Sequence, residues 1–121
     1  MSVAAWVAVG LLGGVAAAAR FVLDHEISLR ARSEFPLGIL AVNLLGALAI
    51  GVVAGSTLRG ELATILSGGL IGSFTTFSTW VLDSHRLALA GRAELAWLNI
   101  GLSVAAGFAA VALGHWLGGA L

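Results

Sequence analysis

The sequence predicts an all-α membrane protein with four membrane-spanning helices. Sixty per cent of its 121 residues are hydrophobic and 10% are charged, whereas soluble domains contain about 45–50% apolar and about 25% charged residues. Its mean hydropathy is +1.05. Four continuous apolar segments each have the length of about 20 residues that a helix needs to cross a membrane. Only helices and closed barrels satisfy the backbone in lipid, and these runs lack the short alternating pattern of barrel strands.

The predicted spans form one domain that covers residues 1–121, and they lie at about residues 3–23, 37–58, 62–82 and 95–117. Polar or charged connections separate them, at residues 24–36, 59–61 and 83–94. The only proline, Pro36, suits the first turn of the second span, where its missing N–H costs little. The N-terminal residues lack the positive region of a cleaved signal, so we expect them to begin the first span.

Composition excludes several function classes. There is no cysteine, which excludes disulfides, thiolate metal sites and cysteine nucleophiles. The net charge is zero and all six basic residues are arginines, so we expect no nucleic-acid partner. The three histidines lack metal-ligand spacing, and no acid pair or nucleophile motif is present. We therefore expect a protein that is not an enzyme.

The arginines also predict an orientation in the membrane. The first and third connections contain four of them, at Arg30, Arg32, Arg86 and Arg92, whereas the opposite side has only Arg59. The positive-inside rule places the two longer connections in the cytoplasm and the N-terminus outside. We expect a multi-pass protein of the cell membrane, surrounded by lipid.

Glycines at a spacing of four occur in three of the predicted spans, as Gly10–Gly14, Gly51–Gly55 and Gly68–Gly72. Such pairs let helix backbones approach closely and associate. Glycine is also common in membrane helices, which explains any single pair. The three pairs together favour an oligomer.

Residues 72–80 read GSFTTFSTW and are unusual for a membrane helix. Five of the seven residues from Ser73 to Thr79 carry hydroxyls. Such hydroxyls can bond back to their own helix, which would explain one or two of them. Five of them, preceded by three glycines, predict instead that the third helix is broken within the membrane. Carbonyls exposed by a break can coordinate a cation.

Asn43 and Arg20 are the polar residues that most need an explanation within the first two spans. The amide of Asn43 either joins two helices through a hydrogen bond or offers a donor to a pore. The guanidinium of Arg20 either reaches the lipid headgroups or provides a positive charge at an anion vestibule. The aromatics Phe74, Phe77 and Trp80 either face lipid or core, or present their electropositive ring edges to an anion.

Three blocks of the sequence resemble the Fluc (CrcB) fluoride ion channel family: GGVAAAARF at 13–21, FPLGILAVNLLGALAIG at 35–51 and GSFTTFSTW at 72–80. The resemblance covers nearly the whole chain in the same order. It implies an antiparallel, dual-topology dimer of four-helix subunits, with two anion pathways along the subunit interface. It also implies passive export of fluoride from the cytoplasm, which would reduce fluoride toxicity.

Site residues follow from the same resemblance. It implies a structural Na⁺ at the dimer centre, held by the backbone carbonyls of Gly72 and Thr75. It places Arg20 at the family's arginine position, in the vestibule. The fluoride pathway would contain a set of donors and ring edges: Asn43, Phe77, Ser78, Trp80 and Ser103.

The chain departs from the family at several positions. The second pore phenylalanine is Trp80, which offers an N–H donor as well as a ring edge. A hydroxyl that often follows Pro-x-Gly is Ile39. The polar track of the fourth helix is thinner, with Asn99, Ser103, Gly107 and Val111. These changes leave open whether both pathways of a homodimer conduct equally.

Two other interpretations remain. The arginine bias suggests a subunit of fixed orientation that pairs with an oppositely biased homologue, with or without a conducting pathway of its own. A small multidrug exporter has the same length and number of spans, but it needs a buried glutamate in its first span, and residues 3–19 contain none.

Overall fold

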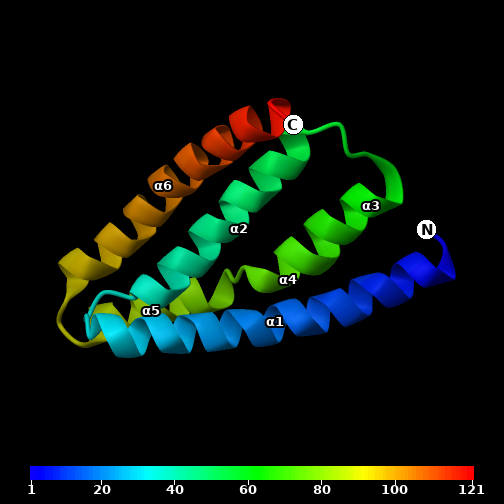
Figure 1. The fold of residues 1–121 in the computed structure, drawn as a ribbon. Helices are drawn as coiled ribbons and strands as arrows, with labels where there is room; N and C mark the ends of the chain where they lie inside the picture. Colours follow the sequence, from blue (N-terminus) through cyan, green and yellow to red (C-terminus); the bar gives the residue numbers. More distant parts are fainter.

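The computed structural model describes residues 1–121 and is all-helical (Figure 1). Four helical segments are long and apolar enough to cross a membrane. They are α1 (Val3–Ala31), α2 (Leu37–Gly55), a composite segment over Gly60–Leu89, and α6 (Ala93–Gly119). Only 15 of the 121 residues are buried, and many large apolar side chains are exposed. This apolar surface needs lipid or a partner subunit, and the chain is a multi-pass membrane protein.

The composite segment has four parts. α3 (Gly60–Thr64) leads into η1 (Ile65–Ile71), a π-helix, which continues as the single turn α4 (Gly72–Phe74). The helix then stops, and it begins again as α5 (Ser78–Leu89).

The helices are longer than the predicted spans where polar residues extend them. α1 continues eight residues past the predicted end at residue 23, into the segment expected to be a connection. Ser28 donates to Asp24 over 3.2 Å, and Arg30 pairs with Glu26 over 3.7 Å. Pairs at this i,i+4 spacing stabilise exposed helical turns. The helix ends where Arg32 adopts a left-handed conformation, with φ at 48°.

The two arginine-rich connections lie at the same end of the molecule, as Figure 1 shows for the α1–α2 and α5–α6 turns. Arg92 joins them, because it forms ion pairs with Glu34 of the first connection and with Glu94, the latter at 2.7 Å. The hydrogen bond that Arg92 donates to Glu94 and the nearby negative charge of Glu34 raise the pKa of Arg92. α2 begins directly after Pro36, which is its N-cap residue and not, as predicted, part of its first turn.

Glycines determine how closely α2 and α6 pack. A Cβ atom at Gly51 or Gly55 would overlap backbone atoms of α6, and one at Gly114 or Gly118 would overlap backbone atoms of α2. The two backbones therefore approach without intervening side chains. This contact makes α2 and α6 the closest-packed pair of helices in the subunit (Figure 1).

The expected role of the glycine pairs in an oligomer needs a correction. The pair Gly51–Gly55 packs within the subunit, against α6. By contrast, Cβ atoms at Gly10, Gly14 and Gly68 would have no neighbour within 4 Å. Only the pairs in α1 and η1–α4 thus retain open surface for a second molecule.

Candidate functional site: a polar groove beside the helix interruption

The third segment is interrupted between Phe74 and Ser78. Thr75 has an extended conformation, with φ −81° and ψ 162°, and helical geometry resumes through Phe77 at φ −85° and ψ −46°. A helix end leaves backbone donors and acceptors without intrahelical partners. The side chains around the interruption supply several of these partners.

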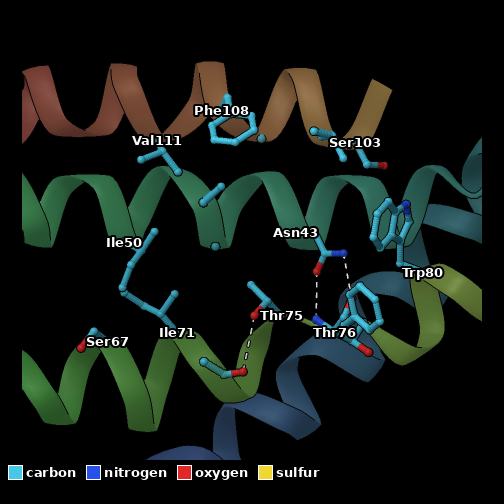
Figure 2. Close-up of a pocket in the computed structure, with 16 residues that line it drawn as sticks. Asn43, Ile50, Ser67, Ile71, Thr75, Thr76, Trp80, Ser103, Phe108 and Val111 are labelled. Carbon is cyan, nitrogen blue, oxygen red and sulfur yellow. Dashed lines mark hydrogen bonds between the residues drawn. The ribbon is translucent and has the colours of Figure 1, made fainter. Parts of the chain in front are cut away.

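Asn43 supports the interruption from α2. Its Nδ2 donates to the carbonyl oxygen of Thr76 and its Oδ1 accepts from the Thr76 N–H, both at 2.9 Å (Figure 2). A helix would have used these two backbone groups itself. The second N–H of the amide is left over, and Asn43 also lines the adjoining groove. Asn43 thus joins α2 to the third segment through hydrogen bonds. The remaining N–H of its amide could act as the donor in a pore.

Hydroxyl groups supply further hydrogen bonds at the interruption. The Thr75 hydroxyl donates to the Gly72 carbonyl oxygen over 3.4 Å. The Thr76 hydroxyl accepts from the N–H of Thr79 over 3.2 Å, in the first turn of α5. Hydroxyls that bond to nearby backbone compete with regular helix. In this segment the hydroxyls bond to nearby backbone and the helix is also interrupted. Both explanations given for the hydroxyls, local bonding and a broken helix, therefore apply.

Arg20 lies in the middle of α1 and not near its end, because the helix continues to Ala31. Its side chain is half-buried, and Nη1 lies 3.5 Å from the carbonyl oxygen of Thr75. The guanidinium therefore faces the interruption. Its role at an anion vestibule stays a prediction.

A groove of about 630 Å³ adjoins the interruption. It runs between α2, the third segment and α6, and its lining contains no carboxylate or other charged side chain. Figure 2 shows Asn43, Ser103 and Trp80 toward one end of the groove, whereas Ile50, Ile71 and Val111 line the other, together with Ser67 and with the ring of Phe108 nearby.

Two aromatics form part of this lining. Phe77 is 74% exposed, and its ring meets that of Trp80 edge-to-face, with centroids 5.5 Å apart and an interplanar angle of 69°. In such a pair the positive edge of one ring meets the negative face of the other. Both rings line the groove on this side.

The groove brings together most of the predicted site residues. Its lining includes four of the five predicted pathway residues and both carbonyl residues: Asn43, Phe77, Trp80, Ser103, Gly72 and Thr75. Ser78 and Arg20 are not part of the lining. Ser78 is exposed at the start of α5.

The positions that depart from the family pattern fall into two groups, those that line the groove and those that are buried away from it. Gly107 and Val111 line the groove and offer no side-chain donor. Ile39 is buried. Asn99 is buried behind Trp80 and is not part of the lining.

Sequence reasoning missed two residues at this site. Thr76 was one hydroxyl among five, and nothing in its neighbours indicated that its backbone pairs with Asn43. Ser84 fell in the predicted connection at 83–94, although it is buried in α5 and bonded to Asn99. Its i+4 spacing from Trp80 was the available signal.

The fold and the groove define a small four-span membrane protein with an uncharged, donor-bearing path beside an interrupted helix. The family model described as CrcB-like protein, Camphor Resistance (CrcB), matches residues 7–115, and the chain belongs to this family.

Relatives support the same assignment over almost the full length. "Fluoride-specific ion channel FluC 2" of Mycobacterium tuberculosis is 39% identical over 117 residues, which cover 97% of this chain and 93% of the relative. The FluC 2 protein of Symbiobacterium thermophilum is 46% identical over 110 residues (87% and 89%). FluC 1 of the same organism is 40% identical over 119 residues (93% and 96%).

Proposed function

We propose that this chain is a subunit of a fluoride-selective ion channel that lets fluoride leave the cytoplasm passively and so reduces fluoride toxicity. The observation that carries the proposal is the convergence of two polar and two aromatic side chains on one uncharged groove: Asn43, Ser103, Phe77 and Trp80. The names of the relatives, which specify fluoride, agree with it.

The chemistry of the groove suits a small, strongly hydrated anion. An anion that leaves water needs replacement hydrogen bonds, because an unpaired charge in a medium of low dielectric constant is very costly. Asn43 has one N–H left for this purpose. The Ser103 hydroxyl lines the groove but donates to Asn99 Oδ1 over 3.4 Å, so it would serve an anion only by turning away from that bond. The edges of Phe77 and Trp80 add positive partial charge. No acidic side chain lines the groove to repel an anion.

The complete channel in this proposal is a dimer of subunits inserted in opposite orientations, with two pathways. The groove is open along one side, and Phe77 at its edge is 74% exposed, so a second subunit would supply the missing wall. In that dimer the interruption at Thr75–Phe77 lies in the middle of the membrane. Non-helical backbone at that depth requires protein or a cavity around it, which the partner subunit and the groove provide.

A structural Na⁺ at the dimer centre is part of the proposal. The residues suit it chemically, because carbonyl oxygens are hard ligands and those of Gly72 and Thr75 lie at the C-terminal, negative end of a helix. The Thr75 carbonyl oxygen already accepts from the cationic Arg20. The chain contains no cluster of three or more acidic or histidine side chains that could hold a metal. Any cation here would therefore depend on backbone oxygens, and it would raise the local positive potential felt by an anion.

A specific observation supports a second candidate function. In this case the chain is a subunit that conducts poorly or not at all and that pairs with a homologue of opposite charge bias. At the far end of the groove Val111 and Gly107 offer no side-chain donor. The arginine bias between the two faces favours one orientation. Symbiobacterium thermophilum has two relatives, named FluC 1 and FluC 2. Paired subunits of opposite orientation would explain both the bias and the thin polar track.

The deciding experiment is ion efflux from liposomes that contain the purified protein alone. We expect rapid fluoride efflux on addition of a potassium ionophore and no chloride efflux above that of empty liposomes. Equal rates for the two anions would overturn the selectivity. No efflux from this protein alone, with restoration by a co-expressed homologue of opposite charge bias, would favour the second candidate.

A further inference from the structure

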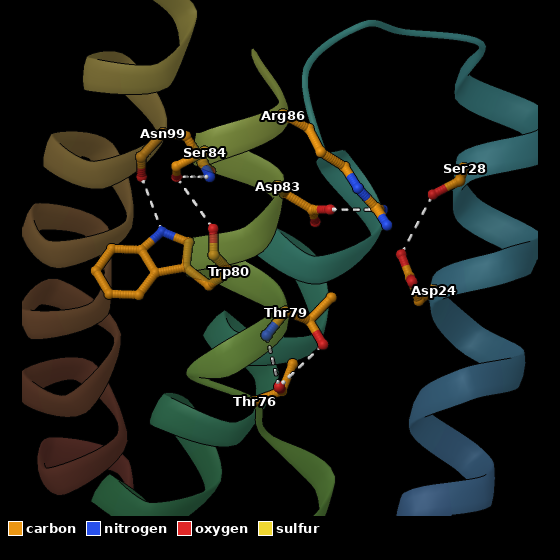
Figure 3. Close-up of polar contacts among 9 residues, drawn as sticks. All are labelled: Asp24, Ser28, Thr76, Thr79, Trp80, Asp83, Ser84, Arg86 and Asn99. Carbon is orange, nitrogen blue, oxygen red and sulfur yellow. Dashed lines mark hydrogen bonds and ion pairs between the residues drawn. The ribbon is translucent and has the colours of Figure 1, made fainter. Parts of the chain in front are cut away.

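Trp80, Ser84 and Asn99 form a buried hydrogen-bond cluster between α5 and α6, which we call the indole clasp. Asn99 is 1% exposed and Ser84 is 6% exposed. Figure 3 shows Ser84 and Asn99 beside the indole of Trp80. Buried polar groups of this kind are costly unless all of their hydrogen bonds are made.

The bonds of the clasp form a closed circuit. The Trp80 Nε1–H donates to the backbone carbonyl oxygen of Asn99 over 3.3 Å. The Asn99 Nδ2 donates to the Ser84 hydroxyl over 2.9 Å, and that hydroxyl donates to the Trp80 carbonyl oxygen over 3.0 Å. No buried side-chain nitrogen or oxygen in the protein is without a partner.

The clasp determines which part of Trp80 reaches the groove. The indole has a single donor, Nε1–H, and no acceptor. That donor is already bonded to Asn99, on the side of the ring that faces α6. Trp80 nevertheless lines the groove and stacks edge-to-face with Phe77. The groove therefore meets carbon atoms of the indole and not its N–H.

Asn99 also reaches a second groove residue. Its Oδ1 accepts from the hydroxyl of Ser103, over 3.4 Å. Asn99 thus holds the indole of Trp80 through its backbone carbonyl, and it holds Ser84 and Ser103 through its side-chain amide. Trp80 and Ser103 both line the groove. The donor and the acceptor of the Asn99 amide are both used, so neither aspartate nor leucine could replace it without leaving a partner unpaired.

We propose that Asn99 is a positioning residue of the ion pathway, acting through Trp80 and Ser103, and that the clasp makes Trp80 present a C–H edge to fluoride while withholding its N–H. This inference rests on the proposed fluoride function. It assigns to Trp80 an electrostatic role that a phenylalanine could also perform. It assigns the additional N–H of tryptophan to the contact between α5 and α6.

The first test observes the indole N–H directly. The other tryptophans, Trp6, Trp97 and Trp116, are 63–72% exposed, and their replacement by phenylalanine leaves Trp80 as the only indole in the full-length protein. With ¹⁵N-labelled tryptophan, we expect one indole signal that exchanges slowly with D₂O and does not shift when NaF replaces NaCl. A shift that depends on fluoride would overturn the inference, because it would place the N–H in the pathway.

The same sample tests the clasp without any ion flux. In Asn99→Ala and in Ser84→Ala the backbone carbonyl that accepts from the indole remains, but the Asn99–Ser84 bond between α6 and α5 is lost. We therefore expect more frequent local opening and at least about tenfold faster exchange of the indole N–H. Unchanged exchange in both variants would contradict the clasp. Thr64→Val is the matched control, since Thr64 is exposed and bonds only to its own helix at Gly60. This readout separates the inference from the proposed function, whose failure would appear only in efflux.

A second test measures coupling. We expect Ser84→Ala to lower fluoride efflux about tenfold in the parent and less than about twofold in a Trp80→Phe background, because the clasp acts through the indole. Trp80→Phe alone should keep selective efflux. Equal losses in both backgrounds would show a structural role for Ser84 that does not involve Trp80, and would overturn the inference.

Discussion

Asn43 of α2 and Thr76 of the interruption exchange two hydrogen bonds, each of 2.9 Å. The Asn43 amide makes the two hydrogen bonds that the N–H and C=O of Thr76 would have made within a continuous helix. The interruption is thus stabilised by a side chain 33 positions earlier in the sequence. The same amide lines the groove, so the stability of the interruption and the chemistry of the path share one residue.

We therefore expect Asn43→Leu to lower both stability and fluoride efflux. Leucine has a similar volume, but it leaves the N–H and C=O of Thr76 unpaired, which costs about 1–3 kcal/mol. Thermal unfolding in detergent should shift to lower temperature, and efflux should fall at least about tenfold. Normal efflux in a well-folded Asn43→Leu protein would contradict the donor role. Thr64→Val serves as the control for removal of an exposed polar group.

In the proposed dimeric channel, Phe77→Ile should abolish fluoride efflux without changing the state of assembly. Isoleucine keeps the apolar character but removes the electropositive ring edge, and Phe77 is too exposed to contribute much to the packing of its own subunit. Size-exclusion chromatography checks the assembly, and liposome efflux checks the function. Efflux at the parent rate would rule out a pathway role for this ring.

Gly114→Ala should destabilise the subunit. A Cβ atom there would overlap the backbone carbonyl of Leu48 in α2, and overpacking of this kind costs about 1–3 kcal/mol. Gly101→Ala is the matched control, because no atom lies within 4 Å of the added Cβ and alanine favours helix by about 1 kcal/mol over glycine. We expect a lower unfolding temperature for Gly114→Ala alone. Similar values for the two variants would disprove the close packing of α2 and α6.

The proposed structural Na⁺ predicts that removal of sodium lowers the thermal stability of the protein. If the carbonyls of Gly72 and Thr75 hold Na⁺, binding to the folded state alone stabilises it by mass action. The unfolding temperature should rise with NaCl concentration and should not rise with N-methyl-D-glucamine chloride. Equal curves in the two salts would argue against a structural sodium ion.

The arginine bias should produce an unequal topology. With reporters fused to the C-terminus, most molecules should have that end outside the cytoplasm, because Arg30, Arg32, Arg86 and Arg92 favour the cytoplasmic side. Substitution of Arg86 and Arg92 by glutamine should reduce the excess. Equal populations in both orientations for the unaltered chain would eliminate the oppositely biased partner and leave a homodimer.

The sequence by itself determined the number of helices, their approximate positions and the family. These follow from long apolar runs and from motifs such as GSFTTFSTW. Both are patterns of residues that lie close together in the sequence. It did not predict the extension of α1 to Ala31, since charged residues suggest a connection unless their i,i+4 pairing is considered.

The tertiary structure alone decided how the polar groups are used. It paired Asn43 with Thr76, turned Arg20 toward Thr75 and bonded the indole N–H of Trp80 to Asn99. It also assigned Gly51 and Gly55 to a contact within the subunit. The physical reason is that a hydrogen bond or a close backbone contact depends on which distant segments meet, and a linear pattern records only which groups need a partner.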